Sequence, residues 1–236
     1  AAVGEDSRAD EIRSLLAAEP VETDLDRVAG VASDVSIILR TPAGDNAVIT
    51  TNAAASGLTT QAACAKLAAA GPGDLLVLQG NLSAETTVAI LRTARHKGMK
   101  TALNPSPLRP YFAVLWPLVD IVFANESEAA ALGGIEALRA AGVAQVVVTM
   151  GAKGAQLVMA GQDVLVPAEP SEAVDTTGAG DCFMATALAS AALRRVALDP
   201  RALRHAAAAA AITVSRPGTG RAFPSAAEMA AILSRP

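Results

Sequence analysis

The sequence predicts an α/β protein in which helices cover both faces of a mainly parallel central sheet. From Leu75 onward, short strand-like runs alternate with helical patterns, as they do in folds built from strand–helix–strand units. The strand-like runs are apolar throughout, which is typical of strands that are buried on both faces of a sheet. The chain has 236 residues, of which 52% are hydrophobic, so it can form one large domain with a sizeable core. Functional residues of such folds lie at the carboxyl ends of the strands.

The expected elements follow one another in a regular order. Strands are expected at Leu75–Gln79, Lys100–Asn104, Asp120–Asn125 and Ala144–Gly151, and a hairpin at Gly154–Pro167. A capped helix is expected over Ser83–Gly98, and a second helix begins within the segment NESEAAAL. Three mostly apolar helices are expected to close the chain, at Gly178–Leu193, Arg201–Ser215 and Ala226–Leu233.

The segment Asp34–Asn52 follows a different pattern. It reads as two strands around a turn at Pro42–Asn46, with no crossover helix between them. We therefore expect a small β-flap, or lid, on the main domain. Such a flap lacks partner strands, and its exposed edge is one that a second copy of the chain can cover, as in a homodimer.

The overall composition excludes several classes of protein. The formal net charge is −4 and no basic cluster stands out, so nucleic acid is not an expected partner. The two cysteines, Cys64 and Cys182, form no CxxC pair, which argues against a disulfide framework or a cysteine-rich zinc site and favours a reducing cytoplasm. No apolar run approaches the ~20 residues that span a bilayer, so no membrane partner is expected.

The segment DTTGAGD, just before the first closing helix, has the residue types of an anion site. Gly178, Ala179 and Gly180 have almost no side chain, so a phosphate oxygen can approach the backbone N–H groups at the positive end of a helix dipole. Asp181, in the first turn, can accept the proton of a hydroxyl that attacks a γ-phosphate. On these residues alone, it is equally open that Asp175 caps a turn and Asp181 is solvated. No GxxxxGK[ST] phosphate-binding loop is present.

Three further segments accompany this one. NESE (residues 125–128) ends a strand, VVVTMGAKGAQLV (146–158) spans a strand and a turn, and AAAAAAITVSRPGTG (206–220) joins a helix to a loop. Together with DTTGAGD, they resemble in order and spacing the motifs of the ribokinase/phosphofructokinase-B family of carbohydrate kinases, over nearly the whole chain. The resemblance implies a three-layer ribokinase-like sandwich with a small β lid.

The resemblance also implies a role for each matching residue. Asp181 would be the catalytic base, and the amides of Gly178, Ala179 and Gly180 would hold the γ-phosphate. ATP would be bound by Asn125, Thr149, Gly151, Lys153, Gly154 and Ala207. Glu128, with Asn125, would order Mg²⁺ through water. A monovalent cation, K⁺, would be held by oxygens near Asp175, Thr177, Thr213, Arg216 and Gly218. Ala222 departs from the family pattern, because many relatives have a hydroxyl at this position. The departure weakens the expectation of a K⁺ site more than the expectation that Asp181 is the catalytic base.

Several of these residues also have a purely structural interpretation. Glu128 can be a capping-box acid at the start of its helix, although this leaves Asn125 unexplained. Thr149 and Gly151 can be ordinary residues at a strand exit. The alanine run from Ala207 is core in part, and its small side chains would also admit a flat base.

The opening of the chain differs from the family pattern. There is no initiator Met and no opening strand, and Val3–Leu16 resembles the VGxDxxG segment that follows the sugar-gripping part. We therefore expect one N-terminally incomplete domain over residues 1–236, with residues 34–52 as the remnant of the lid. We also expect this chain to phosphorylate sugars poorly or not at all, in contrast to a full-length parent. Asn81, at a strand end, is a candidate sugar contact or a cap for the helix at Ser83.

The remaining conspicuous side chains are expected to be structural. His96 lies late in a helix and is expected at the surface, and His205 is expected to support the alanine-rich helix. Cys182 is expected to pack as a small apolar residue against the sheet. Trp116 and Tyr111 flank an apolar turn and are expected to pack there.

Two functions follow from these residues. The first is an ATP-dependent kinase of a sugar or sugar-like alcohol. The second is a catalytically silent nucleotide- or sugar-binding protein of the same fold. The intact Asp181 favours the kinase, because a silent relative would have little need of a carboxylate there.

Overall fold

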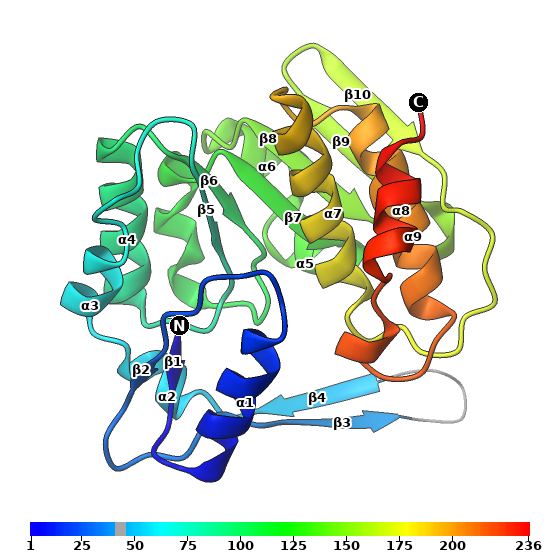
Figure 1. The fold of residues 1–236 in the computed structure, drawn as a ribbon. Helices are drawn as coiled ribbons and strands as arrows, with labels where there is room; N and C mark the ends of the chain where they lie inside the picture. Colours follow the sequence, from blue (N-terminus) through cyan, green and yellow to red (C-terminus); the bar gives the residue numbers. More distant parts are fainter. Residues whose placement is uncertain (41–45) are drawn as a thin grey trace. The chain divides into compact units, whose positions relative to one another are not determined.

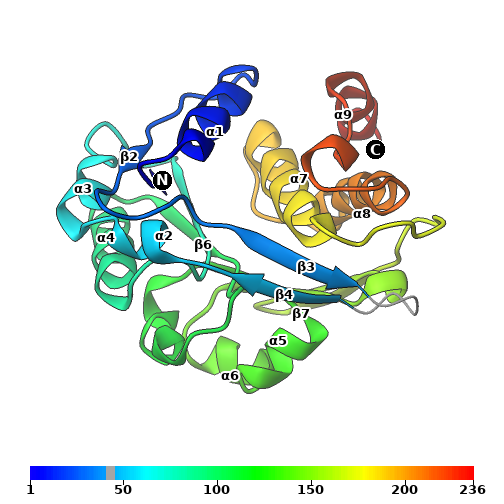
Figure 2. The same cartoon turned by 90° about the horizontal axis from the view of Figure 1, so that it is seen from below.

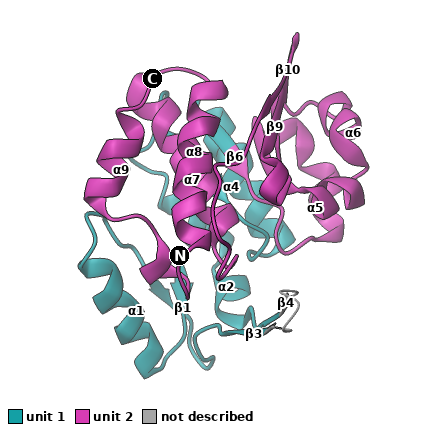
Figure 3. Ribbon diagram, turned by 90° about the vertical axis from the view of Figure 1, so that its right-hand side faces the viewer, with its two compact units in different colours: residues 1–101 teal, residues 102–236 magenta. Residues whose placement is uncertain are grey.

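A computed structural model describes residues 1–40 and 46–236 of the chain. These residues form two compact units, residues 1–101 and residues 102–236, which Figure 3 distinguishes by colour. That the two units make one domain stays a prediction. No helix within the described parts of the chain is long and apolar enough to cross a membrane.

The central sheet confirms the predicted α/β class. Its described strands have the order β10-β9-β8-β7-β6-β5. Strand β7 pairs in parallel with both β6 and β8, whereas β9 runs antiparallel to β8 and β10. The strands are β5 (Leu75–Leu78), β6 (Lys100–Leu103), β7 (Ile121–Asn125), β8 (Gln145–Thr149), β9 (Ala155–Met159) and β10 (Gln162–Val166). The apolar runs form the middle of this sheet, where Val122, Val146 and Val147 are fully buried.

Helices cover both faces of the sheet in unit 2. Figures 2 and 3 show α5 (Glu126–Ala131) and α6 (Gly134–Ala140) on one face and α7 (Ala179–Arg194) and α8 (Pro200–Val214) on the other. Helix α7 has buried residues around most of its circumference and packs along α8, which also contacts β9 and β10. The alanines of α8 allow it to approach α7 closely, and α9 (Ala226–Leu233) packs outside α8 (Figure 1). Short 3₁₀ turns lie at Pro110–Val114 (η1), Trp116–Leu118 (η2), Gly151–Lys153 (η3) and Gly220–Ala222 (η4).

Unit 1 contains the predicted strands of the lid. Strands β3 (Ser36–Arg40) and β4 (Asn46–Thr50) form an antiparallel pair, whereas most of the predicted turn at Pro42–Asn46 lies outside the described residues. The pairing places Ile37 opposite Ile49 on one face, and their exposed fractions are 56% and 60%. The other elements of unit 1 are β1 (Ala2–Val3), α1 (Ser7–Ala17), β2 (Asp26–Arg27), α2 (Ala53–Gly57), α3 (Thr60–Ala65), β5 and α4 (Ala84–His96).

Two of the structural predictions concern helices α4 and α8. Ser83 caps α4 by accepting a hydrogen bond from the Thr86 amide at 3.1 Å, as the sequence predicts. His205 lies in the middle of α8, where Nε2 donates to the Arg235 carbonyl at 3.0 Å and Nδ1 accepts from the Ser190 hydroxyl at 2.8 Å. Because both ring nitrogens are bonded within the buried protein, the structural role of His205 is confirmed.

Cys182 packs elsewhere than predicted. Its neighbours in the core are Ala208 and Ala209 of α8 and Ile232 of α9, so it contributes to a helix–helix core rather than to the contact with the sheet. The turn of α7 that carries Cys182 faces its neighbouring helices, which a pattern of apolar residues on all sides of α7 does not reveal. The other packing predictions are confirmed, since Trp116 is buried against Phe112, Tyr111 contacts the same ring and His96 is exposed.

Candidate active site

The loop before α7 gives this helix an unusual start. Gly178 is the N-cap residue and has a φ of +80°, a conformation that favours glycine, and no side chain caps the helix. A Cβ atom at Gly178 would lie 3.1 Å from the Phe223 ring. The Ala179 amide donates to the Thr176 carbonyl at 3.2 Å, so that predicted phosphate donor already has a backbone partner. No side chain caps the first turn, so the positive end of the α7 dipole is open to an anion in front of the loop.

Asp181 lies in this first turn, and its side chain reaches the surface of the described chain. Surrounding protein atoms that reduce its hydration raise the pKa of its carboxyl, and the negative charge of Glu128 raises it further. The structure therefore brings the DTTGAGD and NESE segments together. A carboxylate with a raised pKa is a stronger proton acceptor than an ordinary aspartate.

Asn125 and Glu128 form a reciprocal capping box at the start of α5. The Glu128 amide donates to Asn125 Oδ1 at 2.8 Å, and the Asn125 amide donates to Glu128 Oε2 at 2.9 Å. The capping box therefore accounts for both Glu128 and Asn125. The expectation that a capping role of Glu128 leaves Asn125 unexplained was wrong. A carboxylate has about four lone-pair sites, so the box leaves Glu128 able to accept hydrogen bonds from water molecules around a cation.

Asp175 joins the loop before α7 to the loop after α8. The residue is 8% exposed, and its carboxylate accepts hydrogen bonds from the Thr177 amide at 3.0 Å and the Gly218 amide at 3.2 Å. Its own amide donates to the Val214 carbonyl at 3.0 Å. Three of the residues predicted to surround a monovalent cation, Asp175, Thr177 and Gly218, are therefore held together.

The other two predicted cation residues use their side chains elsewhere. The buried Thr213 hydroxyl donates to the Ala209 carbonyl at 3.0 Å, and the Arg216 guanidinium forms an ion pair with Glu228 at 2.5 Å. Only the backbone carbonyls of these two residues remain as possible ligands. Ala222 is fully buried and offers no hydroxyl. A monovalent cation fits this loop pair through main-chain oxygens, which are ligands that hard cations accept.

No group of three or more His, Cys, Asp or Glu side chains that could hold a metal occurs in the parts of the chain that the structure describes. Mg²⁺ keeps most of its water in many phosphate-binding sites and needs only one or two carboxylates. The pair of Glu128 and Asp181 fits that kind of site.

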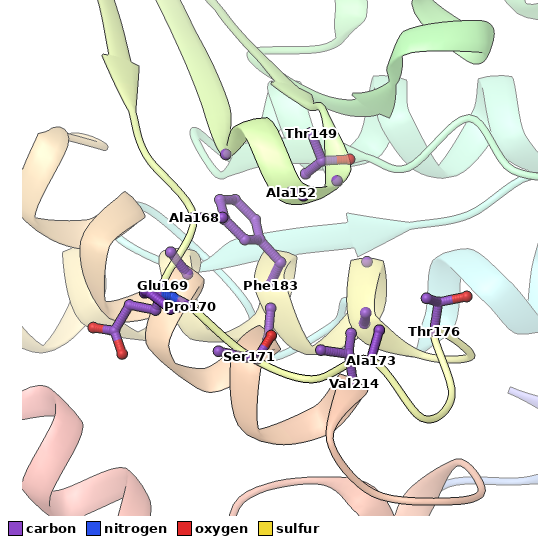
Figure 4. A pocket seen from close by; sticks show the side chains of 17 residues that line it. Thr149, Ala152, Ala168, Glu169, Pro170, Ser171, Ala173, Thr176, Phe183 and Val214 are labelled. Atoms are coloured by element: carbon purple, nitrogen blue, oxygen red, sulfur yellow. The ribbon is translucent and has the colours of Figure 1, made fainter.

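A pocket of about 440 Å³ lies beside the start of α7 (Figure 4). Its described lining comes from the end of β8, η3, the segment after β10, the loop before α7, and helices α7 and α8. The lining residues are Thr149, Gly151, Ala152, Gly154, Ala168, Glu169, Pro170, Ser171, Ala173, Thr176, Ala179, Gly180, Phe183, Ala207, Ala210, Ala211 and Val214. Most of them are small or apolar, as is typical of sites for flat organic ligands.

The pocket includes most of the residues predicted to bind the nucleotide. Thr149, Gly151, Gly154 and Ala207 line it, and the Thr149 hydroxyl donates to the Ala124 carbonyl at 3.5 Å. Lys153 is outside the described lining, and its side chain is exposed and paired with Glu126 at 3.2 Å. The alanines of α8 leave room for a flat ring.

Gly154 sets one wall of the pocket. Its φ is +103°, and a Cβ atom there would lie 2.0 Å from the Val166 carbonyl oxygen and 2.7 Å from the Ala168 amide nitrogen. The start of β9 can therefore pack against the chain after β10 only because this residue has no side chain. That chain continues into the wall of the pocket.

Two parts of the lining were not predicted from the sequence. One is the segment from Ala168 to Ser171, whose only local signal is a proline in a loop that directly follows a strand. The other is Phe183, whose ring extends from α7 toward the side of the pocket formed by Thr149 and Ala152 (Figure 4). In the sequence, Phe183 cannot be told from the core residues on either side of it.

Asn81 belongs to unit 1, whereas Asp181 and the pocket belong to unit 2. Its side-chain amide donates to Gln79 Oε1 at 3.3 Å, and Ser83 is the residue that caps α4. The interpretation of Asn81 as the cap is therefore wrong, and its role as a sugar contact stays a prediction.

Comparison with known proteins identifies the family. The model of the pfkB family carbohydrate kinases matches residues 1–226. The chain belongs to this family. Its relatives include a ribokinase from Bacillus subtilis, 30% identical over 98% of this chain and 80% of the relative, and one from Haemophilus influenzae, 28% identical over 94% and 76%. The crystal structure of a ribokinase from Thermotoga maritima aligns with 99% of this chain and 80% of its own, with a TM-score of 0.85 and 26% identity.

Membership confirms the predicted three-layer fold and the assignment of the chain as a carbohydrate kinase.

Proposed function

We propose that this chain transfers the γ-phosphate of ATP to a hydroxyl of a sugar or sugar-like alcohol, with Asp181 as the general base. The observation that carries this proposal is the position of the start of α7. Ala179 and Gly180 line the pocket, and Asp181, with its raised pKa, follows them directly in the same turn. One turn of helix thus supplies both the anion-binding dipole and the proton acceptor.

The adenine ring occupies the apolar pocket against the alanines of α8. The phosphates extend toward the start of α7, where Gly178 and Gly180 allow close approach of the backbone. Asp181 accepts the proton of the acceptor hydroxyl as its oxygen forms a bond to the γ-phosphorus. The bond from that phosphorus to the bridging oxygen breaks, and ADP leaves.

Glu128 is the residue that would hold Mg²⁺ through water, with Asn125 fixing its side chain in the capping box. The ion would supply neutralisation of the charge on the phosphates. The Asp175 loop would bind K⁺ through main-chain oxygens, close to the turn that carries Thr177. A kinase assay in KCl and in NaCl of equal concentration tests this site.

The acceptor is proposed to be a sugar, and ribose is the first to test because both curated relatives compared above are ribokinases. Asn81 is the candidate contact to one of its hydroxyls. Replacing Asn81 with Ala should then raise the KM for the sugar and leave the KM for ATP unchanged.

The lid is proposed to be an interface between two copies of the chain. Ile37, Leu39 and Ile49 share one face of the β3–β4 pair and are each more than half exposed, an apolar face that a monomer rarely leaves open. Light scattering should give a dimer, and the double variant Ile37→Asp, Ile49→Asp should give a monomer.

The test of the function is an ADP-release assay with ATP and a panel of pentoses and hexoses. Asp181→Asn should lower turnover by about 10²–10⁴-fold and leave ATP binding intact. Asp163→Asn is the matched control, since Asp163 is on the edge strand β10 and its Oδ1 accepts from Gln156, which an asparagine oxygen can also do. Turnover in Asp181→Asn equal to that in the control would disprove the role of Asp181. Binding of ATP without turnover of any sugar, by the unaltered chain and by a full-length parent alike, would indicate a silent binding protein instead.

A further inference from the structure

Glu169 is the one acidic or basic side chain among the described residues that line the pocket. Its carboxylate points away from Thr149 and Phe183 (Figure 4) and forms an ion pair with Arg235, in the segment after α9. The Oε1–Nη1 distance is 2.5 Å, and the two side chains are roughly half exposed. The pocket therefore has a charged group at its wall whose partner comes from a distant part of the chain.

The segment that follows β10 carries Glu169 and forms one wall of the pocket, and this wall is attached to the rest of the unit at both of its ends. At its start, Val166 and Ala168 lie against the backbone of Gly154. At its end, the Val174 and Asp175 amides donate to the Val214 carbonyl at 2.7 and 3.0 Å. Between these attachments, the ion pair with Arg235 ties the wall to the helices behind it.

The backbone of Arg235 is held in place by hydrogen bonds, so its side chain starts from a fixed position when it pairs with Glu169. Its amide donates to the Ile232 carbonyl at 3.1 Å, and its carbonyl accepts from His205 Nε2 at 3.0 Å. Ile232 is buried with Cys182, and His205 is buried in α8, so the backbone of Arg235 is fixed on both α8 and α9. An arginine whose backbone is already fixed loses only side-chain freedom when it forms an ion pair, which lowers the total ordering cost of the pair.

We propose that Arg235 is a positioning residue of the nucleotide pocket, which holds the Glu169 wall in place and neutralises its carboxylate. The inference rests on the proposed binding of ATP in this pocket. Without Arg235, a polyanionic ligand would meet an uncompensated negative charge and a wall fastened only at its ends. The effect is on nucleotide affinity and not on the proton transfer, because neither residue touches the start of α7 in the contacts described.

The test is calorimetric titration of the full chain with ATP, together with the KM for ATP and kcat. Arg235→Ala should raise both the Kd and the KM for ATP about two- to fivefold, the range that an exposed ion pair supports, with kcat unchanged. The increase should shrink at high salt, because the repulsion is screened. Arg235→Lys should keep most of the affinity, and Glu169→Gln added to Arg235→Ala should restore part of it. Arg204→Ala removes an exposed arginine from the same unit and is the matched control.

The outcomes distinguish an error in the proposed function from an error in the role of Arg235. If the unaltered chain does not bind ATP, the proposed function is wrong and this inference falls with it. If the unaltered chain binds ATP and Arg235→Ala binds it equally well, only this inference is overturned. A variant that is less stable and turns over more slowly with an unchanged Kd would show a general structural role, which also overturns it.

Discussion

Gly154 is the position at which one added methyl group should most disturb the nucleotide pocket. Its φ of +103° and ψ of −139° lie in a region that only glycine populates readily. The Cβ of an alanine there would lie 2.0 Å from the Val166 oxygen, whereas an ordinary contact begins near 3.4 Å. The two chain segments must therefore separate by 3.4 − 2.0, or about 1.4 Å, and the wall that follows Val166 moves with them.

Gly151 offers a matched control three residues away in the same turn. It also lines the pocket, its φ is +56°, and a Cβ atom there would meet nothing within 4 Å. Gly151→Ala therefore has only the conformational cost of a left-handed residue, about 1–2 kcal/mol. Gly154→Ala has a backbone cost at least as large, because its region is essentially restricted to glycine, and it has the clash in addition, so a loss of more than about 3 kcal/mol in the free energy of unfolding is expected.

Urea denaturation and ATP titration of both variants measure these effects. We expect Gly154→Ala to lower the free energy of unfolding and to weaken ATP binding about tenfold or more, as a displacement of this size at a binding wall implies. Gly151→Ala should bind ATP within about twofold of the unaltered chain. Equal losses in the two variants would refute the argument from close approach, because the backbone strain would then account for the whole effect.

Three further predictions concern protons. Asp181→Asn should lower kcat by about 10²–10⁴-fold, the usual contribution of a general base, while the Kd for ATP stays within twofold in calorimetry. Burial lowers the pKa of His205 below its ordinary 6.5, so the unfolded chain binds this proton first and stability should fall as pH drops below 6.5. Urea midpoints between pH 5 and 7.5 measure this, and His205→Gln should flatten the dependence; an unchanged slope would contradict it. The ion pair with Arg216 lowers the pKa of Glu228 from 4.5 to about 2. The stabilisation that this ion pair gives is therefore present above pH 4.5 and is lost as the pH falls toward 2. Acid titrations followed by circular dichroism should show this loss in the unaltered chain and not in Glu228→Gln.

The order of the elements could be predicted because their signals are local. The apolar runs, the serine before α4 and the glycine-rich turn before α7 act within a few residues, and the boundaries of α4, α7, α8 and α9 agree with the prediction to within two residues. The lid strands were found for the same reason. The NESE segment also carried a complete local signal, since an Asn followed three residues later by a Glu is a capping-box pattern.

What could not be predicted depends on contacts between distant segments. The wall from Ala168 to Ser171 has no periodicity, and its place in the pocket is set by Gly154 and Val214, which lie elsewhere in the chain. The same holds for Cys182, whose neighbours come from α8 and α9. The pairing of Glu169 with Arg235 spans 66 residues, and no local pattern joins two such positions.

The alanines of α8 have a consequence for how a ligand is selected. Ala207, Ala210 and Ala211 have no rotamers, so a ring that settles against them freezes no side chain and meets a surface already in its bound form. Such a wall cannot repack around a bulkier ring. Discrimination between bases at this wall therefore depends on steric exclusion. Ala210→Val should exclude the bulkier bases and so reduce the number of nucleotides that the chain binds.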